Sequence, residues 1–386
     1  HYMWSYFSNT VVTAQLARNK NEHTHSVIFW QTQAGDPSSR TMSAADDNQR
    51  KALKYISNVT HIACADKYCV IVKTSESASH GGGPGKNVSV VHLCNDIGAP
   101  VAVGSGVQLP MELEKVCMTN SHVVCTCQDY VFVWNYKRNL SNYAEITSKR
   151  ATLNANNKKE LYAFRIDTPM TMIDLGNGVH IAHQPSNDPI CAVTANQHCM
   201  LLARESGDLI RIGFGTNRDP VKFSIGRFGP AKLAVNCNAT RCVSVDSSGN
   251  LKLFCLNTNT KLDFEQKYAW YVLWAPDNED LFAYIEKNRM YICRDMSPEE
   301  PLTSKDGIAS LCEFKDLEVS MVKIDDLMRL ASSKTGEKVT DQSWFLKGME
   351  TKSLRDLAQL ISDLPELKDA FVYCEDNPHP RLYRMV

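Results

Sequence analysis

Tyr130-Val-Phe-Val-Trp-Asn-Tyr136 is the stretch from which the fold of this chain can be inferred. Its aromatic and β-branched residues alternate, which is typical of a strand with two distinct faces. A second apolar run, residues 122–127, precedes it, and only Gln128 and Asp129 lie between the two. Because two residues of this kind can close a β-hairpin, the sequence predicts a hairpin over residues 122–136.

The same pattern returns at residues 241–256 and at residues 280–294. A single hairpin is marginally stable in water, whereas a series of hairpins is typical of radial β repeats such as the β-propeller. Candidate strands extend the series from residues 10–15 and 26–31, the expected first two strands, to residues 318–323. Together they are enough for six or seven blades.

Polar stretches interrupt this series and are expected to be loops. They cover residues 34–51, 75–86 and 137–159. After the last of them, residues 190–225 contain a complete set of four candidate strands, while residues 232–256 contain three.

The hydrophobic period changes near the C-terminal end. Ser353-Leu-Arg-Asp356 and Asp363-Leu-Pro-Glu366 each match a capping box ahead of an apolar stripe. The sequence therefore predicts two short amphipathic helices, with a third beginning at residue 381, as at the entry to an α-solenoid. We divide the chain into a propeller (residues 1–325), a linker (326–352) and the start of a helical solenoid (353–386).

Composition limits the classes of function. The chain has 386 residues, a formal net charge of −1 and a pI of about 6.9, so a dominant nucleic-acid or anionic-membrane surface is not indicated. No apolar run approaches the roughly 20 residues of a transmembrane helix. Most of the 14 cysteines fall inside candidate strands, and we expect reduced, buried thiols. Because the first residue is His1, we expect a fragment of a longer protein.

The glycine-rich segment Gly81-Gly-Gly-Pro-Gly85, followed by Lys86, is the best candidate for phosphate binding. A P-loop needs Ser or Thr after its lysine, but Asn87 occupies this position. The segment also lies between two candidate strands, whereas a P-loop opens a helix. We interpret it as a loop tip.

Metal ligation is not indicated by the cysteines or histidines. Cys125 and Cys127 would lie on one face of a strand, and no second pair with ligand spacing follows. Four histidines fall in polar connections and are expected to be surface or loop residues: His23, His25, His180 and His183.

Catalysis is not indicated either. Gly104-Ser-Gly106 does not supply the Gly-x-Ser-x-Gly of a nucleophile elbow, and Asp277-Asn-Glu-Asp280 is more typical of a turn than of a calcium loop. Some propellers are hydrolases, but such a site requires acidic residues or histidines at the channel ends of the strands. We therefore predict a protein that is not an enzyme, with no catalytic, metal-binding or cofactor-binding residues and no cofactor. The larger aromatic residues are expected in the core: Trp134, Trp270, Trp274 and Tyr284.

Longer blocks of the sequence resemble one protein family, in order along the chain. The most specific are Trp274-Ala-Pro-Asp-Asn278, Lys287-Asn-Arg-Met-Tyr291, Ser297-Pro-Glu-Glu-Pro301 and Glu375-Asp-Asn-Pro-His-Pro-Arg-Leu382. Weaker blocks include residues 188–194 and 203–207. The chain is similar to the WD repeat-containing protein 35 family, also called intraflagellar transport protein 121, a subunit of intraflagellar transport complex A.

This resemblance implies an architecture and a role. Family members carry two propellers followed by a helical solenoid of tetratricopeptide (TPR) type, so the chain is expected to contain the second, seven-bladed WD-repeat propeller and the start of the solenoid. The implied function is a non-catalytic scaffold for retrograde ciliary transport and for entry of membrane proteins into the cilium. Implied partners are other complex A subunits and ciliary cargo or its adaptors, in the cilium, basal body and cytoplasm. A vesicle-coat adaptor is the alternative, because coat subunits share this architecture.

Overall fold

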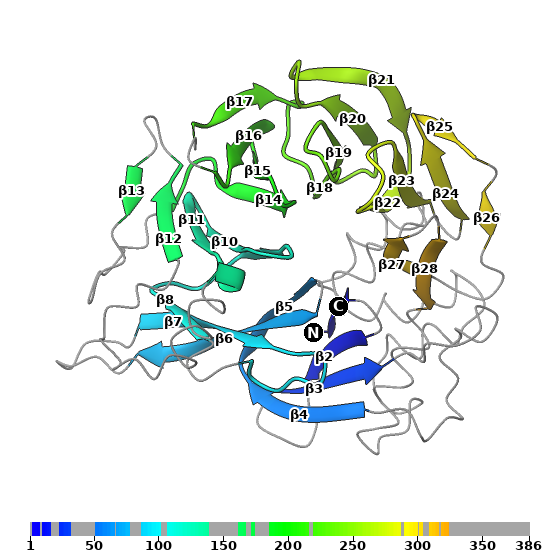
Figure 1. Ribbon diagram of the computed structural model, residues 1–386. Coiled ribbons are helices and arrows are strands. Elements are labelled where there is room, and N and C mark those ends of the chain that lie inside the picture. Colours follow the sequence, from blue (N-terminus) through cyan, green and yellow to red (C-terminus); the bar gives the residue numbers. More distant parts are fainter. Residues whose placement is uncertain are drawn as a thin grey trace, which may run out of the picture.

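The structure of the chain is a computed structural model. It describes residues 2–7, 10–16, 23–31, 51–65, 67–77, 86–101, 106–138, 161–166, 171–173, 185–215, 219–286, 289–299, 301–303, 309–315 and 318–323. Within these residues the regular secondary structure is almost entirely β-strand, and the strands form seven antiparallel sheets arranged as a ring (Figure 1).

The first three sheets follow the chain in order. The first contains β1 (Tyr2–Phe7), β2 (Thr10–Leu16), β3 (Thr24–Gln31) and β4 (Lys51–Ser57). The second contains β5 (Val59–Ala65), β6 (Tyr68–Ser77), β7 (Lys86–Cys94) and β8 (Gly106–Leu109). The third contains β9 (Lys115–Met118), β10 (Val123–Cys127), β11 (Tyr130–Trp134), β12 (Leu161–Arg165) and β13 (Thr171–Ile173).

Four further sheets complete the ring. The fourth contains β14 (Ile190–Ala195), β15 (Cys199–Arg204), β16 (Asp208–Gly213) and β17 (Val221–Ser224). The fifth contains β18 (Lys232–Val235), β19 (Arg241–Val245), β20 (Leu251–Cys255) and β21 (Thr260–Gln266). The sixth contains β22 (Ala269–Trp274), β23 (Leu281–Glu286), β24 (Arg289–Arg294), β25 (Ser297–Pro298) and β26 (Leu302–Thr303). The seventh contains β27 (Ala309–Lys315) and β28 (Glu318–Lys323).

The sheets are the blades of a seven-bladed propeller. The first strand of each sheet is the innermost, and these strands contact one another in the order β1, β5, β9, β14, β18, β22 and β27. Strand β27 contacts β1 in turn, which closes the ring. Each described sheet is built from strands that are consecutive in the chain, and the described strands close the ring where β27 of the seventh sheet packs beside β1 of the first.

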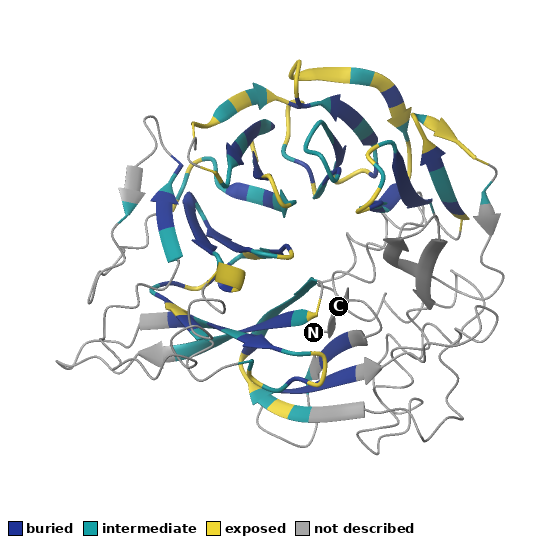
Figure 2. Ribbon diagram, in the orientation of Figure 1, coloured by how far each residue is buried: buried dark blue, intermediate teal, exposed yellow. Residues whose placement is uncertain are grey.

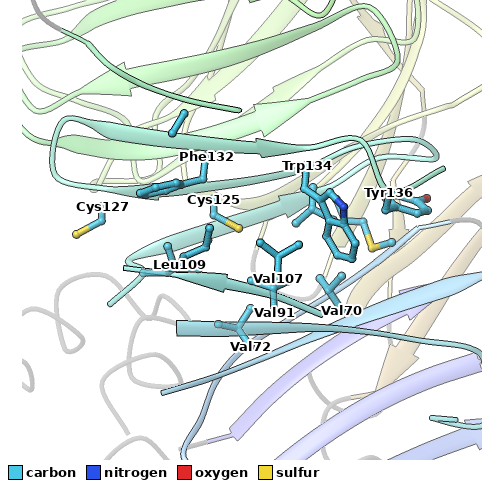
Figure 3. Close-up of a cluster of buried hydrophobic side chains, with 14 of the residues drawn as sticks. Val70, Val72, Val91, Val107, Leu109, Cys125, Cys127, Phe132, Trp134 and Tyr136 are labelled. Atoms are coloured by element: carbon cyan, nitrogen blue, oxygen red, sulfur yellow. The ribbon is translucent and has the colours of Figure 1, made fainter. Parts of the chain in front are cut away.

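The hairpin of β10 and β11 shows why the sequence forms blades. Every residue of both strands is buried, because a blade packs against a neighbour on each side. Phe132 and Trp134 enter the cluster shared with the second blade, whereas Val131 and Val133 enter the cluster shared with the fourth. Figure 3 shows Phe132 and Trp134 on the same side as Cys125, facing valines of the second blade. Alternation therefore separates an aromatic face from a valine face.

Burial is greatest in the middle strands of each blade and lower in the innermost and outermost strands. The middle strands are largely buried, whereas the outer strands β17 and β21 alternate or are mostly exposed (Figure 2). These outer strands carry charged residues such as Lys222, Lys261 and Glu265. Charged side chains on an edge strand oppose pairing with another chain, so the rim is a solvated surface.

The predicted hairpins are confirmed. Strand β10 pairs with β11 and β19 pairs with β20, with Gln128 and Gly249 in the turns at positive φ. Strands β23 and β24 pair as predicted from residues 280–294. The four-stranded set predicted for residues 190–225 is the fourth blade.

Several predictions of strand position were wrong. The first strand is β1, so residues 10–16 form the second strand and not the first. Strand β4 begins at Lys51, the last residue of a predicted loop, and strands β6 and β7 extend to Ser77 and Lys86 inside another. The fifth blade has a fourth strand, β21, which was not predicted because its apolar residues are few. An outer strand packs on one face only, so its hydrophobic signal is weak.

The predicted C-terminal elements lie outside the described residues. This applies to the linker at residues 326–352 and to the helical segment at residues 353–386, both of which stay predictions. Among the described residues, none belongs to a helix long and apolar enough to cross a bilayer.

Candidate protein-interaction surface

The two faces of the ring are built from different connections. Successive strands of a blade run antiparallel, so connections alternate between the two ends of the sheet. The connections from second to third strand, and from one blade to the next, form what we call the upper face. The connections from first to second strand and from third to fourth strand form the lower face.

Phe228 is the most exposed large apolar residue among those described. It lies on the upper face, between β17 and β18, and 81% of its surface is accessible to solvent. Arg227 beside it is also exposed. Exposed Phe and Arg side chains are typical anchors of protein interfaces, because each buries a large area when a partner covers it.

The segment that carries Phe228 is held by the backbone. The N–H of Gly229 donates to the carbonyl of Glu205 (2.7 Å), and the N–H of Ile225 donates to the carbonyl of Gly207 (2.8 Å). A Cβ at Gly229 would overlap the carbonyl oxygen of Arg204, so the two turns touch without room for a side chain. Phe228 is therefore presented on a pre-ordered loop, which lowers the entropy cost of binding.

Tyr268 occupies the equivalent connection one blade further on, between β21 and β22. It is 41% exposed, with a positive φ of 62°, and Lys267 beside it is exposed. The N–H of Ala269 donates to the carbonyl of Gly249 (2.9 Å), which fixes this corner as well. We call Arg227, Phe228, Lys267 and Tyr268 the corner patch. It combines two aromatic rings with two positive charges on adjacent blades.

An ion pair clamps the third blade to the fourth on the same face. Asp129, in the turn between β10 and β11, lies 2.8 Å from the guanidinium of Arg204 at the end of β15, and both side chains are 12% exposed. Arg204 also donates to the carbonyl of Asp188 (2.5 Å) and to that of Ile166. Ser186 Oγ donates to Asp129 (2.9 Å). Further hydrogen bonds to both charged groups thus accompany the ion pair, as a buried pair requires.

Asparagines link the blades on the lower face. Asn196 Oδ1 accepts from the N–H groups of His198 (2.8 Å) and Cys199 (2.9 Å), which ends β14. Asn236 Oδ1 accepts from Thr240 (2.9 Å) and Arg241 (3.0 Å) in the next blade. The amide nitrogen of each asparagine links to the following blade: Asn196 Nδ2 donates to the carbonyl of Asn236 (2.8 Å), and Asn236 Nδ2 donates to the carbonyl of Glu279 (3.1 Å).

The glycine-rich segment has no phosphate-loop geometry at its described end. Lys86 and Asn87 lie in β7, where Lys86 pairs with Ser77 of β6. They therefore open a strand and not a helix, as the sequence predicted. Residues 81–85 and the serine of Gly104-Ser-Gly106 lie outside the described residues.

The cysteines of residues 125–127 are core residues on one face of β10. Both lie in the cluster between the second and third blades, and burial raises the pKa of the Cys127 thiol to about 12 (Figure 3). A thiol held protonated is a poor metal ligand. Within the described ranges, no group of three or more His, Cys, Asp or Glu residues is arranged to hold a metal ion.

The histidines were predicted only in part. His23 is exposed in a turn, as predicted, but His25 is buried in β3, so its assignment to a surface loop was wrong. A period-2 pattern that starts at His25 places it on the covered face of the strand, which outweighs its polarity. His180 and His183 lie outside the described residues.

Asp277–Asp280 and the large aromatics are placed as predicted. The acidic segment joins β22 to β23, and Asp280 accepts from Arg241 of the fifth blade (2.8 Å). The four large aromatics are buried in the core: Trp134, Trp270, Trp274 and Tyr284.

The sequence analysis did not single out Phe228, although it lies in the segment Gly-Arg-Phe-Gly-Pro, which is typical of a turn. Glycine and proline on both sides of an aromatic indicate a turn, and turns usually lie on the protein surface.

Comparison with known proteins assigns this propeller to a family. The family model described as "WDR35 second beta-propeller" matches residues 4–342. The chain belongs to this family. WD repeat-containing protein 35 of Rattus norvegicus is 30% identical over 396 residues, which cover 100% of this chain and 30% of the relative. The human relative is 30% identical over 402 residues, covering 100% and 31%. The chain thus spans about a third of the length of these relatives.

Solved structures also match the chain at low sequence identity. One is described as the "Crystal Structure of Mitotic Checkpoint Complex", with 7% identity, a TM-score of 0.49 and coverage of 84% of this chain and 86% of that chain. Another is Hsv2 of Kluyveromyces lactis, with 9% identity, a TM-score of 0.48 and coverage of 83% and 90%.

Proposed function

We propose that this chain is part of a non-catalytic scaffold subunit of intraflagellar transport complex A. Its role would be protein–protein assembly for retrograde ciliary transport and for the entry of membrane proteins into the cilium. The observation that carries the proposal is the match to the second propeller of the family over residues 4–342. The proposed location is the cilium or flagellum, the basal body and the cytoplasm.

The geometry supports a binding platform. The Asp129–Arg204 pair joins the third and fourth blades on the upper face, and the asparagine links join the fourth, fifth and sixth blades on the lower face, so this part of the ring is held in one shape. The corner patch presents two aromatic rings and two cations from adjacent blades on that face. Aromatic and Arg side chains carry most of the binding energy at protein interfaces, which favours this patch as a contact with another subunit.

Co-purification tests the proposal. The tagged protein would be expressed in ciliated cells, and the proteins it retains would be identified by mass spectrometry. We expect recovery of other complex A subunits. Recovery of vesicle-coat subunits in their place, or of no complex A subunit by a protein shown to be folded, would overturn the proposal.

A further inference from the structure

Three cysteines lie side by side on neighbouring strands of the second blade. Cys64 of β5 is directly opposite Cys69 of β6, and Cys69 is directly opposite Cys94 of β7. All three face the first blade, where Cys69 and Cys94 belong to one apolar cluster and Cys64 packs against it. The Cys69 thiol donates to the carbonyl of Val70 (3.6 Å), and the neighbouring Cys64 thiol adds to the effect of burial in raising the pKa of Cys69.

The register decides which two thiols are closest. The carbonyl of Leu93 accepts from the N–H of Val101 (3.3 Å), so the backbone polar groups of Leu93 point away from β6. Hydrogen bonding alternates along a strand, so Cys94 next to Leu93 exchanges hydrogen bonds with Cys69. The backbone N–H and C=O of Cys69 therefore point toward β7 and not toward β5. Cys64 and Cys69 consequently form a pair without backbone hydrogen bonds between them.

The length of the hairpin turn shows independently that Cys64 and Cys69 are a non-hydrogen-bonded pair. Ala65 pairs with Tyr68, which leaves two residues between them. The pair that flanks a two-residue loop is hydrogen-bonded, so the next pair, Cys64 and Cys69, is not. In such pairs the Cα atoms are about 4.5 Å apart and the side chains are closest, which falls within the range for a disulfide.

Access differs between the two thiols. Cys64 is half-buried and lies three residues from the exposed Lys67 at the hairpin turn. Cys69 is fully buried, and this burial holds the pKa of its thiol well above the usual value. A small oxidant therefore reaches Cys64 first, and Cys69 can react only with a group already beside it.

We propose that Cys64 and Cys69 form a reversible disulfide when a hydroperoxide oxidises Cys64. The Cys64 thiolate attacks the terminal oxygen of the hydroperoxide, the O–O bond breaks, and an alcohol (water, for hydrogen peroxide) leaves. The sulfenic acid of Cys64 is then attacked by the Cys69 sulfur. The S–O bond breaks, the Cys69 proton and the hydroxide leave as water, and the S–S bond forms. Two thiols thus give up two electrons to one hydroperoxide.

Trypsin separates the three cysteines, so the product can be read directly. Cleavage after lysine places Cys64 in residues 55–67, Cys69 in residues 68–73 and Cys94 in residues 87–115. Reduced protein would be treated with increasing hydrogen peroxide, blocked with N-ethylmaleimide and digested without reductant. We expect residues 55–67 linked to residues 68–73, with loss of this product after dithiothreitol and in Cys64→Ser.

Cys255 supplies the matched control. It is half-buried, and its Cα partners are Arg241 and Thr260, so no thiol lies opposite it. Hydrogen bonds from Thr258 lower the pKa of its thiol, which makes it a reporter of oxidant exposure. Cys255→Ser should leave the linked product unchanged.

The proposal is overturned if the Cys255 peptide, residues 253–261, is oxidised in the wild-type protein while residues 55–67 and 68–73 remain unlinked. It is also overturned if Cys69 is linked mainly to Cys94. Both readouts use the wild-type protein and hold even if Cys64→Ser does not fold.

Discussion

The side-chain nitrogen of Asn196 lies 2.8 Å from the main-chain carbonyl oxygen of Asn236, the residue at the equivalent position of the next blade. Nδ2 of Asn236 in turn donates to the carbonyl of Glu279 in the blade after that (3.1 Å). Each asparagine therefore ends the inner strand of its own blade and holds the neighbouring blade. The rigid ring depends on such repeated links as well as on its apolar clusters.

Substitution of Asn196 separates these two roles. Asn196→Asp keeps the oxygen that closes the turn but removes the donor to Asn236, and we expect a loss of about 1–3 kcal/mol of stability. Asn196→Ala removes both roles and should cost more. The measurement is the unfolding midpoint in urea. Asn187→Ala, at an exposed position, is the control and should change little. An Asn196→Asp protein as stable as the wild type would show that the link between blades contributes nothing.

The Asp129–Arg204 clamp should be far more costly to break than a surface pair. Asp129→Ala leaves the guanidinium of Arg204 enclosed without its counter-ion, and we expect a loss of about 3–5 kcal/mol. Asp208→Ala breaks the pair with Lys222, whose side chain is 59% exposed, and should cost at most about 1 kcal/mol. Thermal unfolding of the two variants at equal concentration gives the comparison. Equal effects would mean that Asp129 and Arg204 are not held as a clamp.

Phe228→Asp should weaken retention of complex A subunits by the tagged protein without changing its thermal unfolding. The side chain of Phe228 is 81% exposed, so it packs against little of the protein's own surface. Ile97→Asp is the matched control. Ile97 is 46% exposed and lies on the lower face, in a turn closed by Asn95. Equal loss of partners in both variants would argue against a contact specific to the corner patch.

Gly229→Ala tests whether the loop that carries Phe228 is pre-ordered. An added Cβ would overlap the carbonyl of Arg204, so we expect the loop to move, partner retention to fall and stability to drop by about 1–3 kcal/mol. A Cβ at Gly215 would meet no atom within 4 Å, so Gly215→Ala is the control. If Gly229→Ala retained partners as the wild type does, the fixed geometry of this loop would not matter for binding.

Stability should fall on mild acidification. His61 Nε2 bonds the carbonyl of Glu114 in the next blade (3.0 Å), and burial lowers the pKa of His61 below its usual 6.5. The unfolded chain therefore takes up the proton first, so stability is fully present above pH 6.5 and decreases as the pH falls below this value.

The check is a thermal unfolding series from about pH 7.5 to about pH 5.5. His61→Gln should flatten the decline in part only, because burial also lowers the pKa values of His25 and His92. A melting temperature that does not decline in the wild-type protein over this range would contradict the prediction.

Strong periodic segments were predictable and weak ones were not. The hairpin at residues 122–136 was found because both of its strands are buried on both faces, which demands aromatic and β-branched residues throughout. Outer strands such as β4 and β21 were missed, because only one of their faces needs apolar residues.

The sequence by itself determined the repeated hairpins, the propeller class and the absence of recognisable catalytic motifs, because these depend on local period and on residue type at fixed spacing. Only the tertiary structure decided which residues of distant segments meet. The clamp joins Asp129 to Arg204, and the Cys64–Cys69 pair depends on strand register. Closing seven sheets into a ring sets these contacts, and no local pattern encodes the register or the curvature that brings them together.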